Sequence, residues 1–389
     1  MRETLTRPPA DPLEAVTHPE PYPYYARLTA DRPFGFDAAL GMWVAASAEA
    51  VEAVLEHQSL GVRPPDEPVP AHLTGTATGD VFSRLIRMND GSYHRETRPI
   101  VEAELAAIDG EAVAKIAAGI ARELLAGLET KELPERIDRL MSALPVGVTA
   151  RLVGLGADER ETVTHAVAAF VDAIKPGAPA ASDASTVELL ERLAAARDRE
   201  PGALAGKLAA RLAEDAALAN ALGLLMQSYE ATAGLIGNAL VAARREAVGG
   251  RAVSVDARFA REVARHDAPV QNTRRFALED CRVYGRELRR GDAVLVILAA
   301  ANRDPAANPE PERFLPERDN PRLYTFGRAG HRCPGEEIAV TIAVEAAAAL
   351  RSTGVDWAML PEPAGYVTST NGRIPRFATR AARHSEEGA

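Results

Sequence analysis

The sequence predicts a mainly α fold with small β-sheets, and three observations support this fold class. Apolar residues recur with a period near 3.6 through most of residues 110–197, as they do along the buried face of a helix. Residues 214–245 form the longest helical stretch with apolar residues on most sides, which is typical of a buried helix. Strand signals are short, as at residues 42–46 and at 293–298, where turns at Gly285 and Gly291 precede the strand.

Composition excludes several classes of protein. Of the 389 residues 47% are hydrophobic, enough for a large core, and the net charge of -10 argues against nucleic acid or an anionic membrane as the main partner. Two cysteines cannot form a disulfide framework, which fits a reducing compartment. No stretch approaches the roughly 18 apolar residues of a membrane span, and the N-terminus lacks the apolar region of a signal peptide. We therefore expect a soluble, cytoplasmic protein.

The N-terminal residues are expected to be irregular and to lead into one strand and one helix. Residues 1–35, rich in proline and tyrosine, predict an irregular lead-in with one short helix. Residues 42–46 predict a strand, and Ser47 is the expected N-cap of a helix that runs to His57. Residues 61–80 predict a long loop, and long loops in compact domains are often functional. At the other end of the chain, residues 381–389 predict a disordered tail.

A basic pair follows this loop. Asp90 and Gly91 mark a turn, and the helix that follows places His94 and Arg98 on one face, because residues four apart are neighbours on a helix. Such a pair suits a carboxylate, which an arginine fork binds with two hydrogen bonds. The same spacing is common on solvated helix faces, so the pair alone does not define a site.

The buried helix predicted over residues 214–245 carries polar side chains near its middle. They are Gln227, Ser228, Tyr229, Glu230 and Thr232. Buried polar groups cost free energy unless they are hydrogen-bonded, so this cluster requires either partners or a function.

A glycine-rich loop around Cys333 precedes the Ala-rich segment 336–350. A cysteine that binds a metal must be ionised, and nearby cations and the N-H groups at a helix start favour the thiolate. Arg328, His331 and Arg332 supply the basic neighbours, and Pro334 fits the first position of the helix. The loop therefore predicts a metal-binding thiolate.

This loop resembles the cysteine-ligand loop of the cytochrome P450 family, Phe-Gly-x-Gly-x-His-x-Cys-x-Gly. The matching positions are Phe326, Gly327, His331, Cys333 and Gly335, while Ala329 replaces the second glycine. The resemblance implies that Cys333 is the axial ligand of haem b, iron protoporphyrin IX, and a thiolate ligand favours O-O cleavage. It spans about residues 85–380 and implies a single cytochrome P450 domain over residues 1–389.

The resemblance also gives roles to other residues. His94 and Arg98 match the family's pair that contacts a haem propionate, and Arg275 matches a third propionate contact, with Arg274 as the competing candidate. Glu262 and Arg265 are similar to the family's structural Glu-x-x-Arg pair. Their spacing alone permits an intrahelical ion pair, and such pairs are commonly exposed and weak.

The polar cluster near the middle of the predicted helix resembles the family's distal-helix motif, Ala-Gly-x-Glu/Asp-Thr, but departs from it. Gln227 and Ser228 replace the small pair, which places Ser228 at the cofactor, and Glu230 keeps the acid. Ala231 replaces the threonine whose hydroxyl helps to deliver protons in the family, and Thr232 comes one residue late, about 100° around the helix.

The missing hydroxyl leaves three alternatives. A substrate hydroxyl or a water replaces it, the reaction needs little proton delivery, or peroxide is the oxidant. For Glu230, a proton-relay role and a core carboxylate satisfied by its neighbours both remain open.

The function that the resemblance implies is a bacterial monooxygenase that acts on a small organic molecule, such as a secondary-metabolite precursor. We expect a monomer that receives electrons from a ferredoxin and ferredoxin reductase, with Arg95, Arg328 and Arg332 on the docking face, because opposite charges steer encounter. A non-hydroxylating enzyme for coupling, nitration or peroxide chemistry is the first alternative. A catalytically inactive haem-binding protein is the second. The substrate pocket is expected from residues 61–87, 160–200, 224–232, 268–272 and 367–371.

Overall fold

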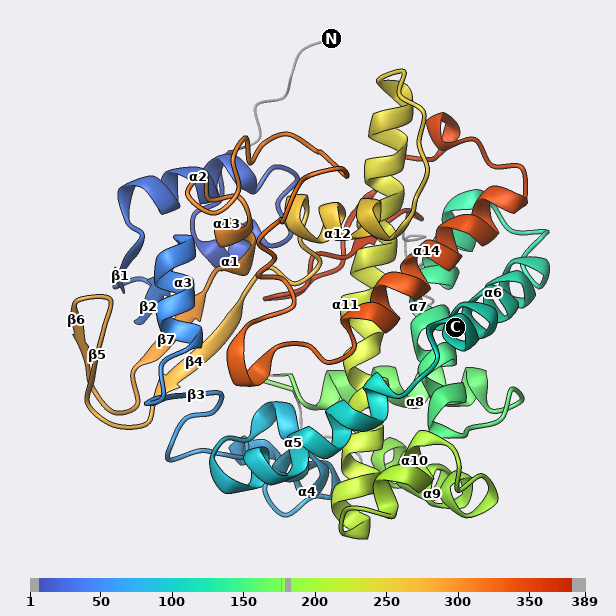
Figure 1. Ribbon diagram of the computed structural model, residues 1–389, viewed down its shortest axis with the longest axis horizontal. Helices are drawn as coiled ribbons and strands as arrows, with labels where there is room; N and C mark the ends of the chain where they lie inside the picture. Colours follow the sequence, from blue (N-terminus) through green and yellow to red (C-terminus); the bar gives the residue numbers. More distant parts are fainter. Residues whose placement is uncertain (1–6, 176, 179–182, 380–389) are drawn as a thin grey trace, which may run out of the picture.

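Helices dominate the structure, a computed structural model that describes residues 7–175, 177–178 and 183–379. Figure 1 shows the short strands gathered on one side of the molecule and the longer helices on the other. This arrangement confirms the predicted mainly α fold with small sheets. The predicted disordered tail lies outside the described residues.

The helices cover most of the described chain. The α-helices are α1 Pro12–Ala15, α2 Tyr22–Asp31, α3 Ala48–Leu55, α4 Ala77–Arg84, α5 Gly91–Ala106, α6 Gly110–Ala126, α7 Leu133–Val153, α8 Arg160–Ala173, α9 Ala184–Arg199, α10 Leu204–Ala209, α11 Glu214–Val248, α12 Ala257–His266, α13 Leu298–Asn302 and α14 Glu336–Ser352. Short 3-10 helices lie at Ala71–Leu73, Ile86–Met88, Ala329–His331 and Trp357–Met359.

The long helix α11 runs through the helical part of the molecule (Figure 1). It is 35 residues long and matches the apolar stretch that the sequence predicts. Helices α7 and α14 pack against it, and α14 also packs on α6. Leu222, Leu235 and Leu240 of α11 are 1% exposed or less. The helix is therefore packed on most sides within the core, as expected for a helix with apolar residues on most faces.

The strands form one mixed sheet and two small hairpins. The mixed sheet has the order β1-β2-β7-β4-β3, with β2 and β7 parallel and the other neighbours antiparallel. Its strands are β1 Phe34–Asp37, β2 Met42–Ala45, β3 Leu60–Gly61, β4 Thr273–Ala277 and β7 Ala293–Val296. The hairpins pair β5 Cys281–Val283 with β6 Arg286–Leu288, and β8 Gly365–Tyr366 with β9 Pro375–Arg376. Strand β4, paired with β7, carries Arg275.

Two predictions about the N-terminal segment are wrong in detail. The lead-in contains two helices, α1 and α2, because Asp11 caps α1 by accepting from the N-H groups of Leu13 and Glu14. The predicted loop at 61–80 is shorter than expected, because α4 already begins at Ala77 behind its cap, Thr76. The prediction for Ser47 is confirmed, since its hydroxyl accepts from the N-H of Ala50 at 3.2 Å.

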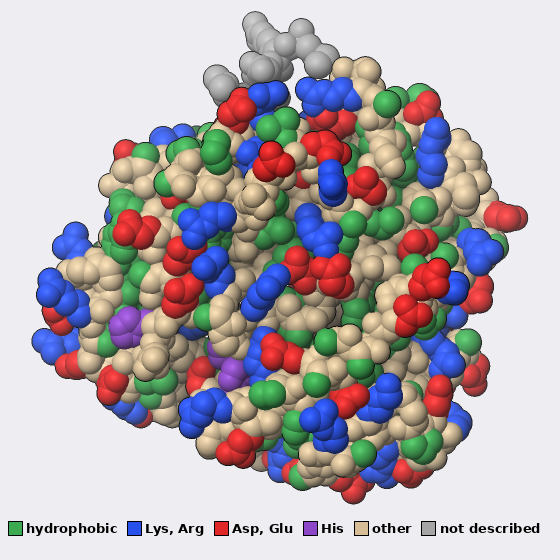
Figure 2. Space-filling model, in the orientation of Figure 1, with side chains coloured by type: hydrophobic (Ala, Val, Ile, Leu, Met, Phe, Trp, Pro, Cys, Tyr) green, Lys and Arg blue, Asp and Glu red, His purple; other side chains and the backbone are tan. Residues whose placement is uncertain are grey.

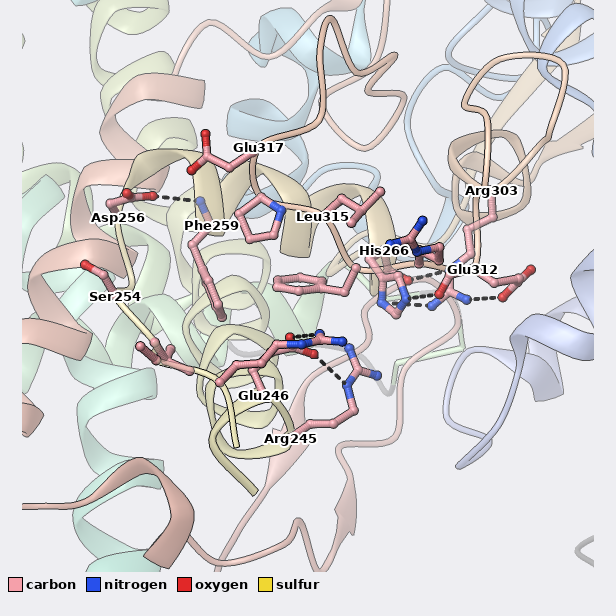
Figure 3. Close-up of a pocket in the computed structure, with 16 residues that line it drawn as sticks. Arg245, Glu246, Ser254, Asp256, Phe259, His266, Arg303, Glu312, Leu315 and Glu317 are labelled. Carbon is pink, nitrogen blue, oxygen red and sulfur yellow. Dashed lines mark hydrogen bonds and ion pairs between the residues drawn. The ribbon is translucent and has the colours of Figure 1, made fainter. Parts of the chain in front are cut away.

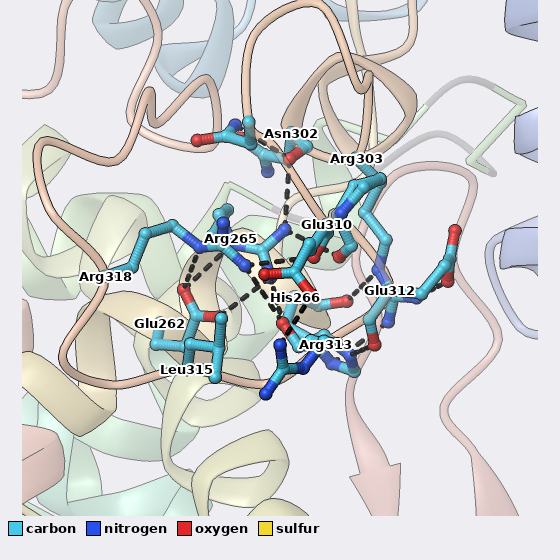
Figure 4. A network of polar contacts seen from close by, with 12 residues as sticks. Glu262, Arg265, His266, Asn302, Arg303, Glu310, Glu312, Arg313, Leu315 and Arg318 are labelled. Carbon is cyan, nitrogen blue, oxygen red and sulfur yellow. Dashed lines mark hydrogen bonds and ion pairs between the residues drawn. The ribbon is translucent and has the colours of Figure 1, made fainter.

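A buried ion pair fastens α12 to the segment that leads to Cys333 (Figure 4). Arg265 binds both carboxylate oxygens of Glu262 at 2.8 Å, and the two side chains are 0% and 1% exposed. Arg265 also donates to three backbone carbonyls, those of Asn302, Pro311 and Arg313. The spacing therefore marks a buried structural pair and not the exposed pair that is the common case.

No helix within the described ranges is both long and apolar enough to cross a membrane.

Candidate functional site

A cavity of about 420 Å³ lies between α11 and the loop that carries Cys333. Its walls come from segments far apart in the chain: the start of the 61–80 segment, the residues before α5, the middle of α11, strand β4 and the cysteine loop. The lining residues on which the site depends are Val62, Arg63, Arg87, Arg98, Gln227, Ser228, Ala231, Thr232, Arg274, Arg275, Phe326, Gly327, His331, Cys333 and Gly335. The cavity therefore unites residues that the sequence analysis singled out separately.

The cysteine loop folds back on itself before α14. The N-H of Cys333 donates to the carbonyl of Phe326 at 2.7 Å, and the N-H of Gly327 donates to that of Tyr324 at 2.8 Å. Gly327 has φ of 71°, and a side chain at this position would meet the carbonyl of His331 at 3.2 Å. Ala329 also has a positive φ, 50°, at the position where the family pattern has glycine. The loop thus keeps the glycine-type backbone at this position although the residue has changed.

The electrostatics of Cys333 differ from the sequence prediction. Burial raises the pKa of the Cys333 thiol, and the backbone N-H of Gly335, Arg87 and Arg98 act in the opposite direction. The cations that act on the sulfur thus come from other parts of the fold and not from the basic residues beside it in sequence. Pro334 also lies before the helix, since α14 begins at Glu336.

His94 and Arg98 lie together on α5, as predicted. The Nε2 atom of His94 is buried without a hydrogen-bond partner, and its ring lies 4.3 Å from that of His331. Burial, followed by the charges of His331 and Arg98, lowers the pKa of His94 to about 4. Arg98 donates to Glu102 at 2.9 Å and to the carbonyl of Arg332. The pair is therefore tied directly to the cysteine loop.

Arg275 reaches the same cavity from β4. It is buried, and among the described residues its guanidinium makes one hydrogen bond, to the carbonyl of Arg274 at 2.9 Å. Burial lowers the pKa of Arg275 to about 10, and Arg87 acts in the same direction. Arg274 also lines the cavity, so the structure brings in both of the competing candidates.

The middle of α11 forms the opposite wall. Ser228, Ala231 and Thr232 all line the cavity, so the angular offset of Thr232 does not remove it from the site. The Ser228 hydroxyl donates to the carbonyl of Leu225 at 2.8 Å, whereas the hydroxyl of Thr232 makes no hydrogen bond with any described residue. Thr232 is therefore the hydroxyl of this wall that is available to a ligand or water.

Glu230 does not line this cavity. Its carboxylate pairs with Lys175, which follows α8, at 3.0 Å, and the two side chains are 25% and 43% exposed. Glu230 lines a second cavity of about 290 Å³ together with Tyr229, Ala233 and Arg376. The carboxylate thus has a cationic partner, which suits either of the roles left open by the sequence.

Two lining arginines lie in the range 61–87 expected to line the pocket, although the sequence analysis did not single them out. Arg63 lies in the predicted loop, and Arg87 lies in the 3-10 helix Ile86–Met88. Arg87 stands alone between apolar neighbours, Ile86 and Met88, and that contrast was the signal that could have identified it. Two ranges expected to line the pocket do not contribute, because no described residue of 160–200 or 367–371 lines this cavity.

Another hollow, of about 830 Å³, lies elsewhere, beside α12 and the segment before the cysteine loop (Figure 3). Its lining charges pair with one another: Arg303 binds Glu312 at 2.6 Å, and Arg251 binds Glu246. His266 at its edge accepts from Arg303 and contacts the carbonyl of Glu312. Because its charged side chains already bind one another, we interpret this hollow as a structural groove. Its volume alone does not make it the reactive site.

The residues around Cys333 fit a haem. A flat dianionic porphyrin needs a sulfur ligand, an apolar surface and cationic partners for its propionates. Cys333 and Phe326 supply the first two. The unpartnered Nε2 of His94 and the nearly unpartnered guanidinium of Arg275 are buried polar groups that lack the acceptors such groups require. Propionates would satisfy them.

Comparison with known proteins agrees with this geometry. Residues 258–343 match the family model described as Cytochrome P450. A putative cytochrome P450 133B1 from Xylella fastidiosa is 26% identical over 82% of this chain and 85% of its own length. The 6-deoxyerythronolide B hydroxylase of Saccharopolyspora erythraea is 27% identical over 66% of this chain and 67% of its own.

A solved structure shares the fold over nearly the whole chain. It is the bacillaene polyketide synthase cytochrome P450 PksS of Bacillus subtilis 168. It superimposes with a TM-score of 0.76 at 20% identity, covering 95% of this chain and 98% of that one.

Proposed function

Because the chain belongs to the cytochrome P450 family and is a monooxygenase-type oxidoreductase, we propose that it oxidises a small organic substrate, a secondary-metabolite precursor, with O2. The observation that carries the proposal is the position of Cys333, which faces the middle of α11 across a cavity lined by six arginines. A hydroxylase and a polyketide synthase P450 among the similar proteins support the metabolite class.

The family implies a haem-thiolate cofactor, and we propose haem b. Cys333 would bind the iron, while His94, Arg98 and Arg275 would hold the propionates. Phe326, Gly327, His331 and Gly335 would shape the loop around the sulfur: the hydrogen bond from Cys333 to Phe326 fixes the turn, and His331 is held by Asp90 at 3.0 Å. When bound, such a haem activates O2 and transfers one oxygen atom to the substrate.

Proton delivery would fall to α11. Ala231 offers no hydroxyl, so we assign the proton-carrying role to the free hydroxyl of Thr232, or to a water held by Thr232 and Ser228. Glu230 would exchange protons with the second cavity, and Lys175 would hold its carboxylate in place. Together, these residues would hold and transfer protons on the α11 side of the cavity.

We propose a ferredoxin as the electron donor, and the charges on the surface refine where it docks. Arg328 is paired with Glu52 and Glu56, and Arg332 with Glu336. On the face shown in Figure 2, acidic and basic side chains are interspersed without one large patch of either sign. Arg95, which is exposed and makes no ion pair with a described residue, is the unpaired cation of the predicted set. An acidic partner that docks at Arg328 or Arg332 would have to displace the glutamates that pair with these arginines.

A second candidate is a non-hydroxylating or peroxide-driven reaction, which the alanine at position 231 favours. Substrate-dependent NADPH consumption with a surrogate ferredoxin and reductase tests the first proposal. Turnover with hydrogen peroxide and no reductase would replace it by the second. An Ala231→Thr variant should raise the share of electrons that reach product if α11 lacks a proton donor. An unchanged share would contradict that role for position 231.

A further inference from the structure

We propose that the substrate of this cavity is an amphipathic carboxylic acid, whose carboxylate binds Arg87 while Arg63 and Arg274 add to the positive potential around it. This inference rests on the proposed function and names its substrate class. It follows from an excess of cations that the cofactor does not use.

The lining of the cavity has charges of one sign. Six arginines and one histidine contribute to it: Arg63, Arg87, Arg98, Arg274, Arg275, Arg332 and His331. None of the described residues that line it is an aspartate or a glutamate. A space walled by one sign of charge concentrates ligands of the opposite sign.

Some of these arginines have partners elsewhere, and others have none. Arg98 binds Glu102, and Arg332 binds Glu336 at 3.0 Å. The guanidinium of Arg63 donates only to backbone carbonyls, those of Glu67 and Pro68, each at 3.1 Å. Within the described ranges, the side chains of Arg87 and Arg274 make no hydrogen bond or ion pair.

Arg87 faces the cavity. Its side chain is exposed, yet burial is the main cause that lowers the pKa of its guanidinium, so the exposed surface faces the cavity and not bulk water. The charges of Cys333 and Glu230 favour its charged form, but neither makes an ion pair with it among the described residues. Arg87 is therefore a cavity-lining cation without a bound carboxylate in the described part of the chain.

The charges of a haem do not balance this set. Its two propionates are matched by Arg98, Arg275 and the unpartnered nitrogen of His94, which leaves Arg87 together with Arg63 and Arg274. Burial lowers the pKa of Arg63 and of Arg275, and neighbouring cations act in the same direction: Arg274 on Arg63, and Arg87 on Arg275. A charge removed from water needs a partner, and the arginine fork fits a carboxylate with two parallel hydrogen bonds.

The rest of the wall indicates an apolar body for the ligand. Apolar side chains of the cavity include Val62, Met88, Leu224 and Val270. Its uncharged polar groups on α11 and β4 are few, and they include Gln227 and Thr273. A pocket of this kind takes a mostly apolar molecule that is oriented by one or two polar contacts.

The test is a binding titration of the ferric, haem-loaded protein, followed by the change in its absorption spectrum. The probes are decanoic acid and 4-phenylbutanoic acid, each beside its own primary amide, which has the same shape without the charge. We expect each acid to bind at least about tenfold more tightly than its amide, a difference of about 1.4 kcal/mol. Arg87→Gln should remove that preference and leave the amide affinity within about twofold.

Matched variants separate this role from others. Arg84→Gln makes the same change three residues away, where Arg84 pairs with Asp215 on the surface, and should keep the acid preference. Arg87→Lys should keep part of it. If Arg87→Gln cannot be purified in folded form, two other measurements test the inference. The wild type should prefer each acid over its amide, and Arg274→Gln should reduce that preference.

Three results would overturn the inference: equal affinities for acid and amide in the wild type, no spectral change with any acid in the millimolar range, or an Arg87→Gln variant that either keeps the acid preference or no longer binds haem. Loss of haem in that variant would make Arg87 a propionate partner. The spectrum of the reduced carbon monoxide complex, recorded on each sample, separates the two proposals. A thiolate spectrum without acid preference contradicts only the substrate class, whereas a missing thiolate spectrum contradicts the proposed function.

Discussion

Replacing Arg265 with alanine should remove a large part of the stability of the protein. The change leaves the carboxylate of Glu262, 1% exposed, without its bidentate partner in the core, where Arg318 at 3.7 Å and the N-H of Leu315 are its other partners. Breaking a buried pair in this way costs about 3–5 kcal/mol. The carbonyls of Asn302, Pro311 and Arg313 also lose a donor, and each such loss costs up to about 1–3 kcal/mol. We therefore expect a loss of at least about 4 kcal/mol, against a typical total of about 5–15.

The assay is urea unfolding of the purified protein followed by circular dichroism, with haem content measured on the same samples. The matched control is Arg258→Ala on the same helix, where Arg258 and its partner Glu317 are 71% and 75% exposed. Exposed pairs contribute at most about 1 kcal/mol, so this variant should unfold near the wild-type midpoint. If Arg265→Ala lost no more stability than Arg258→Ala, the buried network would not hold the cysteine loop in place.

Three further predictions follow from other parts of the fold. Burial and the charge of Arg303 lower the pKa of His266 from 6.5 to about 2. Below pH 6.5, His266 is therefore protonated in the unfolded chain and stays neutral in the folded protein. Stability should therefore fall by roughly 1.4 kcal/mol between pH 7.5 and 5.5, and His266→Gln should reduce this slope in urea unfolding at the two pH values. Ala329→Gly should stabilise the protein by up to about 1.5 kcal/mol in the same assay, because φ of 50° costs a non-glycine residue about 1–2 kcal/mol, partly offset by chain entropy. Lys175→Ala removes the partner of Glu230 and should lower turnover while costing less than about 1 kcal/mol of stability, measured by product formation and unfolding side by side.

Each of these has a clear contrary result. An unchanged pH slope in His266→Gln would mean that another group controls acid sensitivity. A less stable Ala329→Gly protein would mean that the left-handed backbone there carries no strain. Full turnover in Lys175→Ala would remove the Glu230 pair from proton delivery.

The sequence predicted the parts of the fold that depend on local pattern. Helix α11 followed from its apolar faces, and the cap at Ser47 followed from residue type, because both signals lie within one element. The start of α14 was misplaced at Pro334, since a proline fits either the first turn of a helix or the turn before it. The burial of Arg265 could not be read from spacing, because an i,i+3 pair looks the same on a surface and in a core.

The site was predictable where a motif fixed both residue and spacing. Cys333 and Arg98 line one cavity, and His94 lies beside it against His331, as the motifs indicated. Arg87 lies in the predicted pocket range 61–87 but was not singled out. No carboxylate of a described residue lines the cavity around it, and that property appears only when the separate segments come together in the fold. For the same reason the cations that act on Cys333 were misassigned to its sequence neighbours.

The most direct test of the account is the absorption spectrum of the dithionite-reduced protein with carbon monoxide, recorded beside a Cys333→Ala variant. The account predicts the long-wavelength Soret band of a thiolate-ligated haem in the wild type and its loss in the variant. A protein that binds no haem, or a band at the position typical of histidine-ligated haem, would contradict the assignment of Cys333 as the iron ligand.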